Sequence, residues 1–156
     1  MRPKARKKVL LIEPNYANKF PPIGLMKIST YYRNLGNWDV VFFKGDLTTF
    51  VIERIADKCI AELELIDNSI DWGIRKDRVF DYIKTRKHEA LDSIGVEDSN
   101  FELLIRGKLD DYKNYYWKGI WKSHPEWDRV CVTTLFTFYW DITVETIIFA
   151  QQLDRD

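Results

Sequence analysis

Two short apolar runs enclose a longer segment with helical periodicity near the start of the chain. Val9–Ile12 and Val40–Phe43 are unbroken apolar runs, which are typical of strands buried on both faces of a sheet. Between them, Ile23–Leu35 carries apolar side chains at intervals of three and four, the period of a helix that covers a sheet. Gly36 ends this helix. Two strands joined by one helix predict a right-handed crossover with parallel strands.

The same alternation continues and then returns near the end of the chain. An apolar stripe from Val51 to Ile66, started by Thr48–Thr49, predicts a second helix that covers the sheet. Arg129–Phe138 has strand character again, and either Asp141 or Thr143 can cap a last helix. We therefore predict an α/β fold with a small, open and mostly parallel sheet. It corresponds to an incomplete three-layer fold of the flavodoxin or Rossmann type.

Residues 67–127 interrupt this alternation. The segment is charged and helical in character, and we expect an insertion that packs on one edge or end of the sheet. Periodicity does not decide whether Phe101–Leu109 is a helix or a strand. Much of the chain's high aromatic content, 15%, lies near the end of the insertion. This aromatic cluster either caps the sheet as core or forms a docking surface, and comprises Tyr115, Tyr116, Trp117, Trp121 and Trp127.

Charge and length limit the classes of partner. The 24 basic and 24 acidic residues cancel, so no global field favours nucleic acid or a membrane surface. Residues 1–8 form a basic tail, which is either a solvated leader or a nucleic-acid arm; the lack of interleaved aromatic residues favours the leader. Residues 9–156 are expected to form one domain that contains the insertion. No apolar run reaches the length of a membrane span, and Cys59 and Cys131 are typical of buried thiols in a reducing cytoplasm.

The candidate binding residues follow the predicted strands. Ligands of doubly wound sheets bind at the carboxyl ends of the strands, where the strand order reverses; a strand order of 2-1-3 puts that point between the first and third strands. The loop after the first strand is stiffened by two prolines and leads into a helix start that favours an anion; alternatively it is a rigid connection without a ligand. Threonines end the third strand, where they either bind a polar ligand such as a phosphate or are simply strand residues. The full candidate set is Asn15, Tyr16, Asn18, Lys19, Gly24, Lys44, Asp46, Thr133, Thr134 and Thr137.

Catalytic signatures are missing from the sequence. It contains no P-loop, no Gly-x-Gly-x-x-Gly, no His-Glu-x-x-His, no Gly-x-Ser-x-Gly and no Cys or His spacing typical of a metal site. No nucleophile and base are placed together by the predicted elements. We therefore predict no catalytic residue and no metal ligand in this chain.

Several of these motifs together resemble a known family. Pro14–Asn15, Pro21–Leu25, Gly36 and Val40–Phe43 follow the pattern that opens the cobalamin-binding-like domain N-terminal to the catalytic barrel in radical S-adenosylmethionine proteins. Asp128–Phe138 resembles the third strand of the same domain. The resemblance implies a non-catalytic accessory domain, of a kind used with and without cobalamin, whose corrin amides the threonines of the third strand could bind. It also implies a radical S-adenosylmethionine catalytic domain, in the same or another chain, as its partner.

The chain departs from that family in three ways. The Asp-x-His-x-x-Gly motif for cobalt is absent, because Arg86 precedes His88 by two positions and Lys122 precedes His124. Cys59 and Cys131 are too far apart to hold the 4Fe-4S cluster, so the cluster and S-adenosylmethionine would belong to a region outside this chain. The usual fourth and fifth strands are also absent. The resemblance thus implies either the front part of a longer protein or a shortened relative.

Two other functions are compatible with the same features. One is a stand-alone module that binds a nucleotide-like or phosphorylated ligand at the strand ends and regulates a partner. The other is a structural module that forms a homodimer through its open sheet edge.

Overall fold

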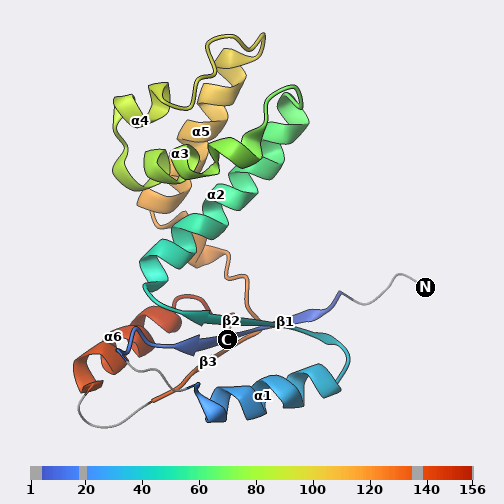
Figure 1. Ribbon diagram of the computed structural model, residues 1–156, viewed down its shortest axis with the longest axis vertical. Helices are drawn as coiled ribbons and strands as arrows, with labels where there is room; N and C mark the ends of the chain where they lie inside the picture. Colours follow the sequence, from blue (N-terminus) through green and yellow to red (C-terminus); the bar gives the residue numbers. More distant parts are fainter. Residues whose placement is uncertain (1–4, 18–20, 135–138, 156) are drawn as a thin grey trace. The chain divides into compact units, whose positions relative to one another are not determined.

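The computed structural model describes residues 5–17, 21–134 and 139–155 (Figure 1). The chain divides into two compact units. The first, here the sheet unit, comprises Met1–Leu47 and His124–Asp156, and the second, here the helical unit, comprises Thr48–Ser123.

The sheet unit contains a three-stranded parallel sheet. Its strands are β1 (Lys7–Glu13), β2 (Trp38–Lys44) and β3 (Arg129–Val132), in the order β2-β1-β3. Val9 of the central strand lies opposite Val40 on one side and Arg129 on the other. The α/β class, the small open parallel sheet and the 2-1-3 strand order predicted from the sequence are therefore confirmed.

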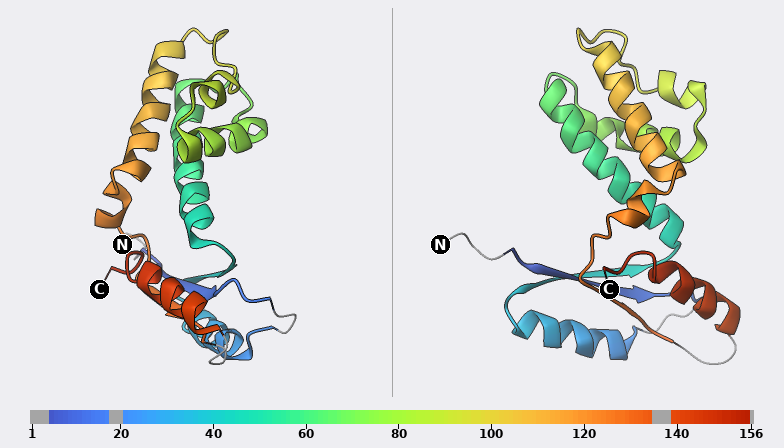
Figure 2. Two further views of the ribbon diagram at one scale, coloured as in Figure 1. Left: turned by 90° about the vertical axis from the view of Figure 1, so that its left-hand side faces the viewer. Right: turned by 180° about the vertical axis from the view of Figure 1, so that it is seen from behind.

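The central strand supplies the core of the sheet unit. Val9, Leu10, Leu11 and Ile12 are completely buried, which is why the sequence reads as an unbroken apolar run. Helix α1 (Ile23–Asn34) lies along one face of the sheet, where its Leu25 packs against Val9 and Leu11 (Figure 2). Helix α6 (Trp140–Ala150) packs against the edge strand β3.

The helical unit is built from consecutive helices. They are α2 (Leu47–Ile66), α3 (Trp72–Thr85), α4 (His88–Asp92), α5 (Glu102–Trp117) and the short 3-10 helix η1 (Ile120–Ser123). Asp71 caps α3 by accepting a hydrogen bond from Ile74 N at 3.2 Å. The indole of Trp72 is buried and donates to the Asp67 carbonyl at 2.9 Å, which fixes the turn between α2 and α3. Phe101–Leu109, which periodicity left open, belongs to the start of α5.

Helix α2, which was expected to cover the sheet, belongs to the helical unit and packs with its helices. The helix itself is present over the expected residues, but it joins the helical unit from Thr48 onward, and the compact unit begins there rather than at residue 67. Asp57 of α2 pairs with Lys76 of α3 at 2.6 Å, and Glu62 of α2 accepts a hydrogen bond from Tyr112 of α5 at 2.6 Å. An apolar stripe shows which face of a helix is buried but not what buries it.

The ends of three other elements differ from the sequence-based expectations. The tail is shorter than eight residues, because β1 begins at Lys7 and Arg6 pairs with Asp39 at 3.0 Å. Strand β3 ends at Val132, and residues 135–138 lie outside the described part of the chain. Helix α6 begins at Trp140, before either predicted cap, and Thr143 is a buried residue inside the helix rather than its cap.

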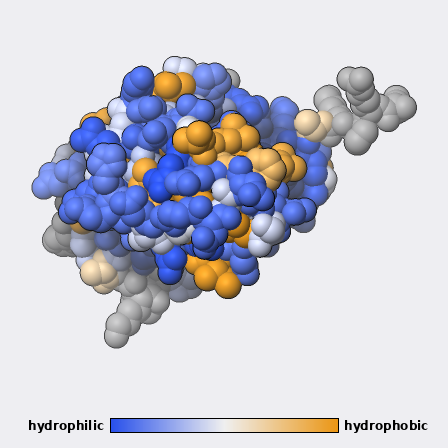
Figure 3. Space-filling model, turned by 90° about the horizontal axis from the view of Figure 1, so that it is seen from above, coloured by the Kyte–Doolittle hydropathy of each residue, from blue (hydrophilic) through white to orange (hydrophobic). Residues whose placement is uncertain are grey.

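The aromatic cluster is divided between the two units. Trp127 is buried in the sheet unit, as expected for core. Trp117 of the helical unit is 45% exposed, and its indole donates to the Ile83 carbonyl at 2.7 Å while the Arg86 guanidinium lies over the ring. Seen from above, hydrophobic patches interrupt a mainly hydrophilic surface (Figure 3). The exposed apolar side chains of the helical unit include Leu65, Ile74, Phe101, Leu103 and Leu104. Within the described residues, no helix is both long and apolar enough to cross a membrane.

Candidate functional site

The carboxyl ends of the three parallel strands meet at one end of the sheet unit. At this edge the last residue of β1, Glu13, is only 2% exposed, although it is a carboxylic acid. Its register partner is Lys44, the last residue of β2, and the Lys44 Nζ lies 3.3 Å from Glu13 Oε1. A buried carboxylate requires a cationic or hydrogen-bonding partner. Lys44, predicted as a ligand contact, therefore serves first as the counter-ion of Glu13.

Tyr16 fills the space between the end of β1 and helix α6. It is 2% exposed, and its hydroxyl shares a short hydrogen bond with the Thr143 Oγ1 of α6. Its ring lies 4.9 Å from the ring of Tyr139, tilted by 38°. The ligand contact predicted for Tyr16 stays a prediction; in this structure the side chain is buried and its hydroxyl bonds to Thr143.

The remaining predicted residues that the structure describes differ in exposure. Asn15, Gly24, Asp46 and Thr134 are exposed. A Cβ placed on Gly24 would meet no atom within 4 Å, so there is open space at the start of α1. Thr133 is half-buried and its backbone amide donates to the Ile12 carbonyl at 2.9 Å, which continues the β3 register. Asn18, Lys19 and Thr137 lie outside the described residues.

This edge can bind polar groups but has no visible catalytic apparatus. Asn15 and Thr134 offer amide and hydroxyl groups to solvent at the carboxyl ends of β1 and β3. In the described part of the chain, no group of three or more His, Cys, Asp and Glu side chains is placed to hold a metal ion.

Cobalamin, the cofactor implied by the family resemblance, would have to displace buried side chains if it bound beside the end of β1. A corrinoid nucleotide tail inserted between β1 and α6 would require the volume that the Tyr16 ring occupies, and it would break the Tyr16–Thr143 hydrogen bond. Thr143 is itself only 4% exposed, so its hydroxyl would lose a buried partner.

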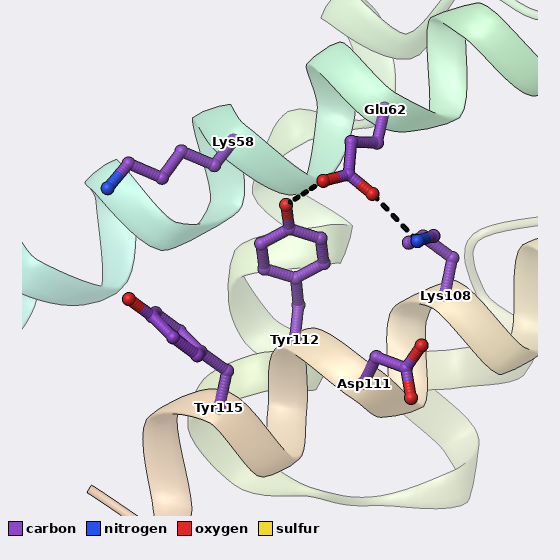
Figure 4. A pocket seen from close by; sticks show the side chains of 6 residues that line it. All are labelled: Lys58, Glu62, Lys108, Asp111, Tyr112 and Tyr115. Carbon is purple, nitrogen blue, oxygen red and sulfur yellow. Dashed lines mark hydrogen bonds and ion pairs between the residues drawn. The ribbon is translucent and has the colours of Figure 1, made fainter. Parts of the chain in front are cut away.

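The helical unit contains a cavity of about 340 Å³ between α2 and α5 (Figure 4). Lys58 and Glu62 of α2 face Lys108 and Tyr112 of α5, and Asp111 and Tyr115 complete the lining. The Glu62 carboxylate receives the Tyr112 hydroxyl at 2.6 Å and the Lys108 ammonium at 2.7 Å.

These contacts shift the pKa values of the side chains that line the cavity. The hydrogen bond from Lys108, followed by the one from Tyr112, lowers the pKa of Glu62 below its usual value. The pKa of Lys108 is raised, chiefly by its hydrogen bond to Glu62. Burial, followed by the hydrogen bond to Glu62, raises the pKa of the Tyr112 phenol. Glu62 and Lys108 are therefore both ionised at neutral pH and neutralise each other.

Sequence reasoning missed Glu13 and the cavity of the helical unit. Glu13 could have been found, because it is the one charged residue attached directly to the end of the first apolar run, and Lys44 stands at the same place after the second. The cavity had a weaker signal. Lys58 and Glu62 are one helical turn apart, as are Lys108 and Tyr112, but nothing in the sequence pairs these two turns with each other.

Comparison of the chain with models of protein families, with curated proteins and with solved structures finds no match.

Proposed function

We propose that this chain is a non-catalytic accessory domain of a radical S-adenosylmethionine enzyme, and that it works without a corrinoid of its own. The catalytic domain would be in the same or another polypeptide. One observation carries the proposal: the sheet has the 2-1-3 order of the domain that the sequence motifs resemble, and its carboxyl edge is built around a neutralised ion pair at the end of the central strand.

The exposed groups at this edge define the contribution of the domain. Asn15 and Thr134 can hydrogen-bond to a polar part of the substrate, or to the partner surface, while the Glu13–Lys44 pair keeps the ends of β1 and β2 together. Radical chemistry would remain with the partner, which must supply three thiolates for its cluster. The free thiols Cys59 and Cys131 fit a reducing compartment such as the cytoplasm.

The test is to purify the chain, tagged at its N-terminus, from its source organism without oxygen. If the proposal is right, the purified material carries an iron–sulfur absorption band and cleaves S-adenosylmethionine to deoxyadenosine. Added aquocobalamin should leave its own spectrum unchanged, because cobalamin would have to displace the buried Tyr16 side chain. Material that contains neither iron nor cleavage activity would overturn the proposal.

A matched pair of variants locates the contribution of the carboxyl edge. Asn15 and Asn37 are both exposed, but Asn15 follows β1 at the carboxyl edge and Asn37 precedes β2 at the opposite end of the sheet. Asn15→Ala should lower the yield of deoxyadenosine in the purified material, and Asn37→Ala should not. Equal yields from both variants would remove the carboxyl edge from the proposal.

One observation favours the phosphate-binding alternative. Among the described residues, no side chain caps the start of α1 and none lies within 4 Å of a Cβ built on Gly24, so the helix start can receive an anion. Titration with inorganic phosphate, followed by the amide resonance of Gly24, separates the two functions. A saturable shift at millimolar phosphate supports the stand-alone module, and an unchanged resonance supports the accessory domain.

A further inference from the structure

The outer face of helix α1 is apolar and basic. Ile23, Met26 and Tyr31 are each more than half exposed. Lys27 and Arg33 are exposed as well, and the helix contains no Asp or Glu. The spacings of these five residues place them on one side of the helix, opposite the side that packs on the sheet. Grouped apolar side chains at a surface mark a site of interaction.

One end of the helical unit carries the opposite charge. It is formed by residues 64–71, where α2 ends, and residues 97–104, where α5 begins, and is here called the acidic tip (Figure 1). The Ser99 hydroxyl donates to the Asp67 carboxylate at 2.6 Å and so joins the two segments. The acidic tip contains six acidic residues and no Lys or Arg. Arg106 pairs with two of the six, so the tip keeps a negative charge.

The acidic tip also exposes large apolar side chains. Leu65, at the end of α2, is 88% exposed, and Leu103, near the start of α5, is 89% exposed. Phe101 and Leu104 are close to half exposed. Removing these side chains from water would stabilise a complex in which a partner covers them. The negative charge around them favours a partner whose surface is apolar and basic.

The outer face of α1 has this composition. Two α1 faces packed together would bring Lys27 and Arg33 of one copy against the same cations of the other, and two acidic tips packed together would bring carboxylates against carboxylates. Like charges across an interface disfavour both arrangements. Of the three pairings, α1 against the acidic tip alone combines opposite charges. The formal net charge of the chain is zero, so two copies do not repel each other as a whole.

We propose that the outer face of α1 in one copy of this chain docks on the acidic tip of a second copy. The two surfaces differ, so the contact is heterologous and leaves one surface of each kind open on a pair of copies. Further copies can therefore add until a ring closes or a filament forms. The inference goes beyond the proposed function and does not depend on it, because it requires no catalytic partner.

Sedimentation velocity of the full chain, from micromolar to millimolar concentration, tests the association. The mean sedimentation coefficient should rise with concentration above that of an 18.6 kDa monomer. The rise should be smaller at high salt, because salt screens the attraction between exposed charges. A coefficient that stays at the monomer value throughout would overturn the proposal, since the two surfaces would then be left to another partner or be covered within one chain.

Two variants without any change of charge locate the contact. The α1 variant combines Met26→Asn with Tyr31→Asn, and the tip variant combines Leu65→Asn with Leu103→Asn. Each removes exposed apolar side chains from one of the two surfaces, so each alone should associate about tenfold more weakly than the unchanged chain, or less.

A control variant makes the same kind of change outside both surfaces. Trp140 and Ile148 are exposed residues of α6. Trp140→Asn combined with Ile148→Asn should leave the association unchanged. An equal loss of association in this control would mean that the contact is not confined to α1 and the acidic tip, and would contradict the proposal.

An equal mixture of the α1 variant and the tip variant separates loss of the contact from loss of the fold. The α1 variant keeps its acidic tip and the tip variant keeps its α1 face, so one unchanged contact can form between them. The mixture should therefore give complexes of two copies and no larger ones, although neither variant associates alone. A mixture that stays monomeric, or a single variant that associates as strongly as the unchanged chain, would overturn the proposal.

Discussion

The Lys44 ammonium lies 3.3 Å from the Glu13 carboxylate, and the two residues are register partners at the ends of β2 and β1. The Glu13 side chain is almost completely buried, whereas the Lys44 side chain is one-third exposed. The ion pair therefore joins the ends of β1 and β2, and only its carboxylate is shielded from water. Loss of the lysine should be costly because it would leave a buried, uncompensated charge.

The first prediction tests this pair. Lys44→Met should destabilise the sheet unit by about 2 kcal/mol, which is less than the loss of a fully buried ion pair because water reaches the lysine. Urea unfolding measures the change. Lys27, an exposed residue of α1, gives the control, and Lys27→Met should change stability by less than about 0.5 kcal/mol. If the double variant Glu13→Gln with Lys44→Met is no more stable than Lys44→Met alone, the unpaired carboxylate is not the source of the loss.

The second prediction concerns the hydrogen bond between Tyr16 and Thr143. Tyr16→Phe should destabilise the chain by about 1–2 kcal/mol, because the buried Thr143 hydroxyl loses a partner. Thr143→Val should have a similar effect, and the double variant should cost less than the sum of the two. A double-mutant cycle measured by urea unfolding gives the coupling. Additive losses would show that the hydroxyls stabilise the fold independently.

Much of the sheet unit could be predicted from the sequence because local patterns specify it. The unbroken apolar run at Val9–Ile12 reflects burial on both faces of β1, and the helical period before Gly36 reflects the packing of α1 on that strand. The crossover rule then yields the parallel orientation. Each inference depended on residues close together in the chain.

The partner of α2 and the details of the site were not predictable in this way. The stripe containing Ile55, Cys59 and Leu63 indicates a buried face, but the same stripe suits a sheet or other helices. Tyr16 was read as a ligand contact because it is polar and lies in the expected loop. Its partner in the structure, Thr143, lies 127 positions away, and no periodicity links residues at that separation.

The third prediction is a pH dependence that originates at Asp67. Hydrogen bonds from Ser69, followed by the one from Ser99, lower the pKa of this carboxyl below its usual value. A group with a lowered folded-state pKa stabilises the fold above its unfolded pKa of about 4, and this stabilisation is lost as the pH falls through the folded pKa. Asp67→Asn should therefore lower the urea midpoint of the helical unit at neutral pH, and the difference should disappear in strong acid.

A neighbouring exposed aspartate gives the control for this pH dependence. Asp77 is an exposed residue of α3. Asp77→Asn should change the urea midpoint little at neutral pH, because no comparable set of hydrogen bonds to its carboxylate is broken. If the urea midpoint of Asp67→Asn stays equally far below that of the unchanged chain in strong acid, the effect comes from the shape of the turn rather than from the charge of Asp67.

The fourth prediction concerns the reactivity of the two thiols. Burial, followed by the nearby Glu62 carboxylate, raises the pKa of Cys59 to about 12, so only about 10⁻⁴ of the thiol is ionised at pH 8. Cys131 is half-buried in β3, and burial also raises the pKa of its thiol. Ellman's reagent at pH 8 should therefore modify Cys131 first in the folded chain and reach Cys59 only through unfolding. The fast phase of the reaction with Ellman's reagent should remain in the Cys59→Ala variant and be lost in the Cys131→Ala variant. A fast phase in Cys131→Ala would mean that α2 opens readily enough to expose Cys59.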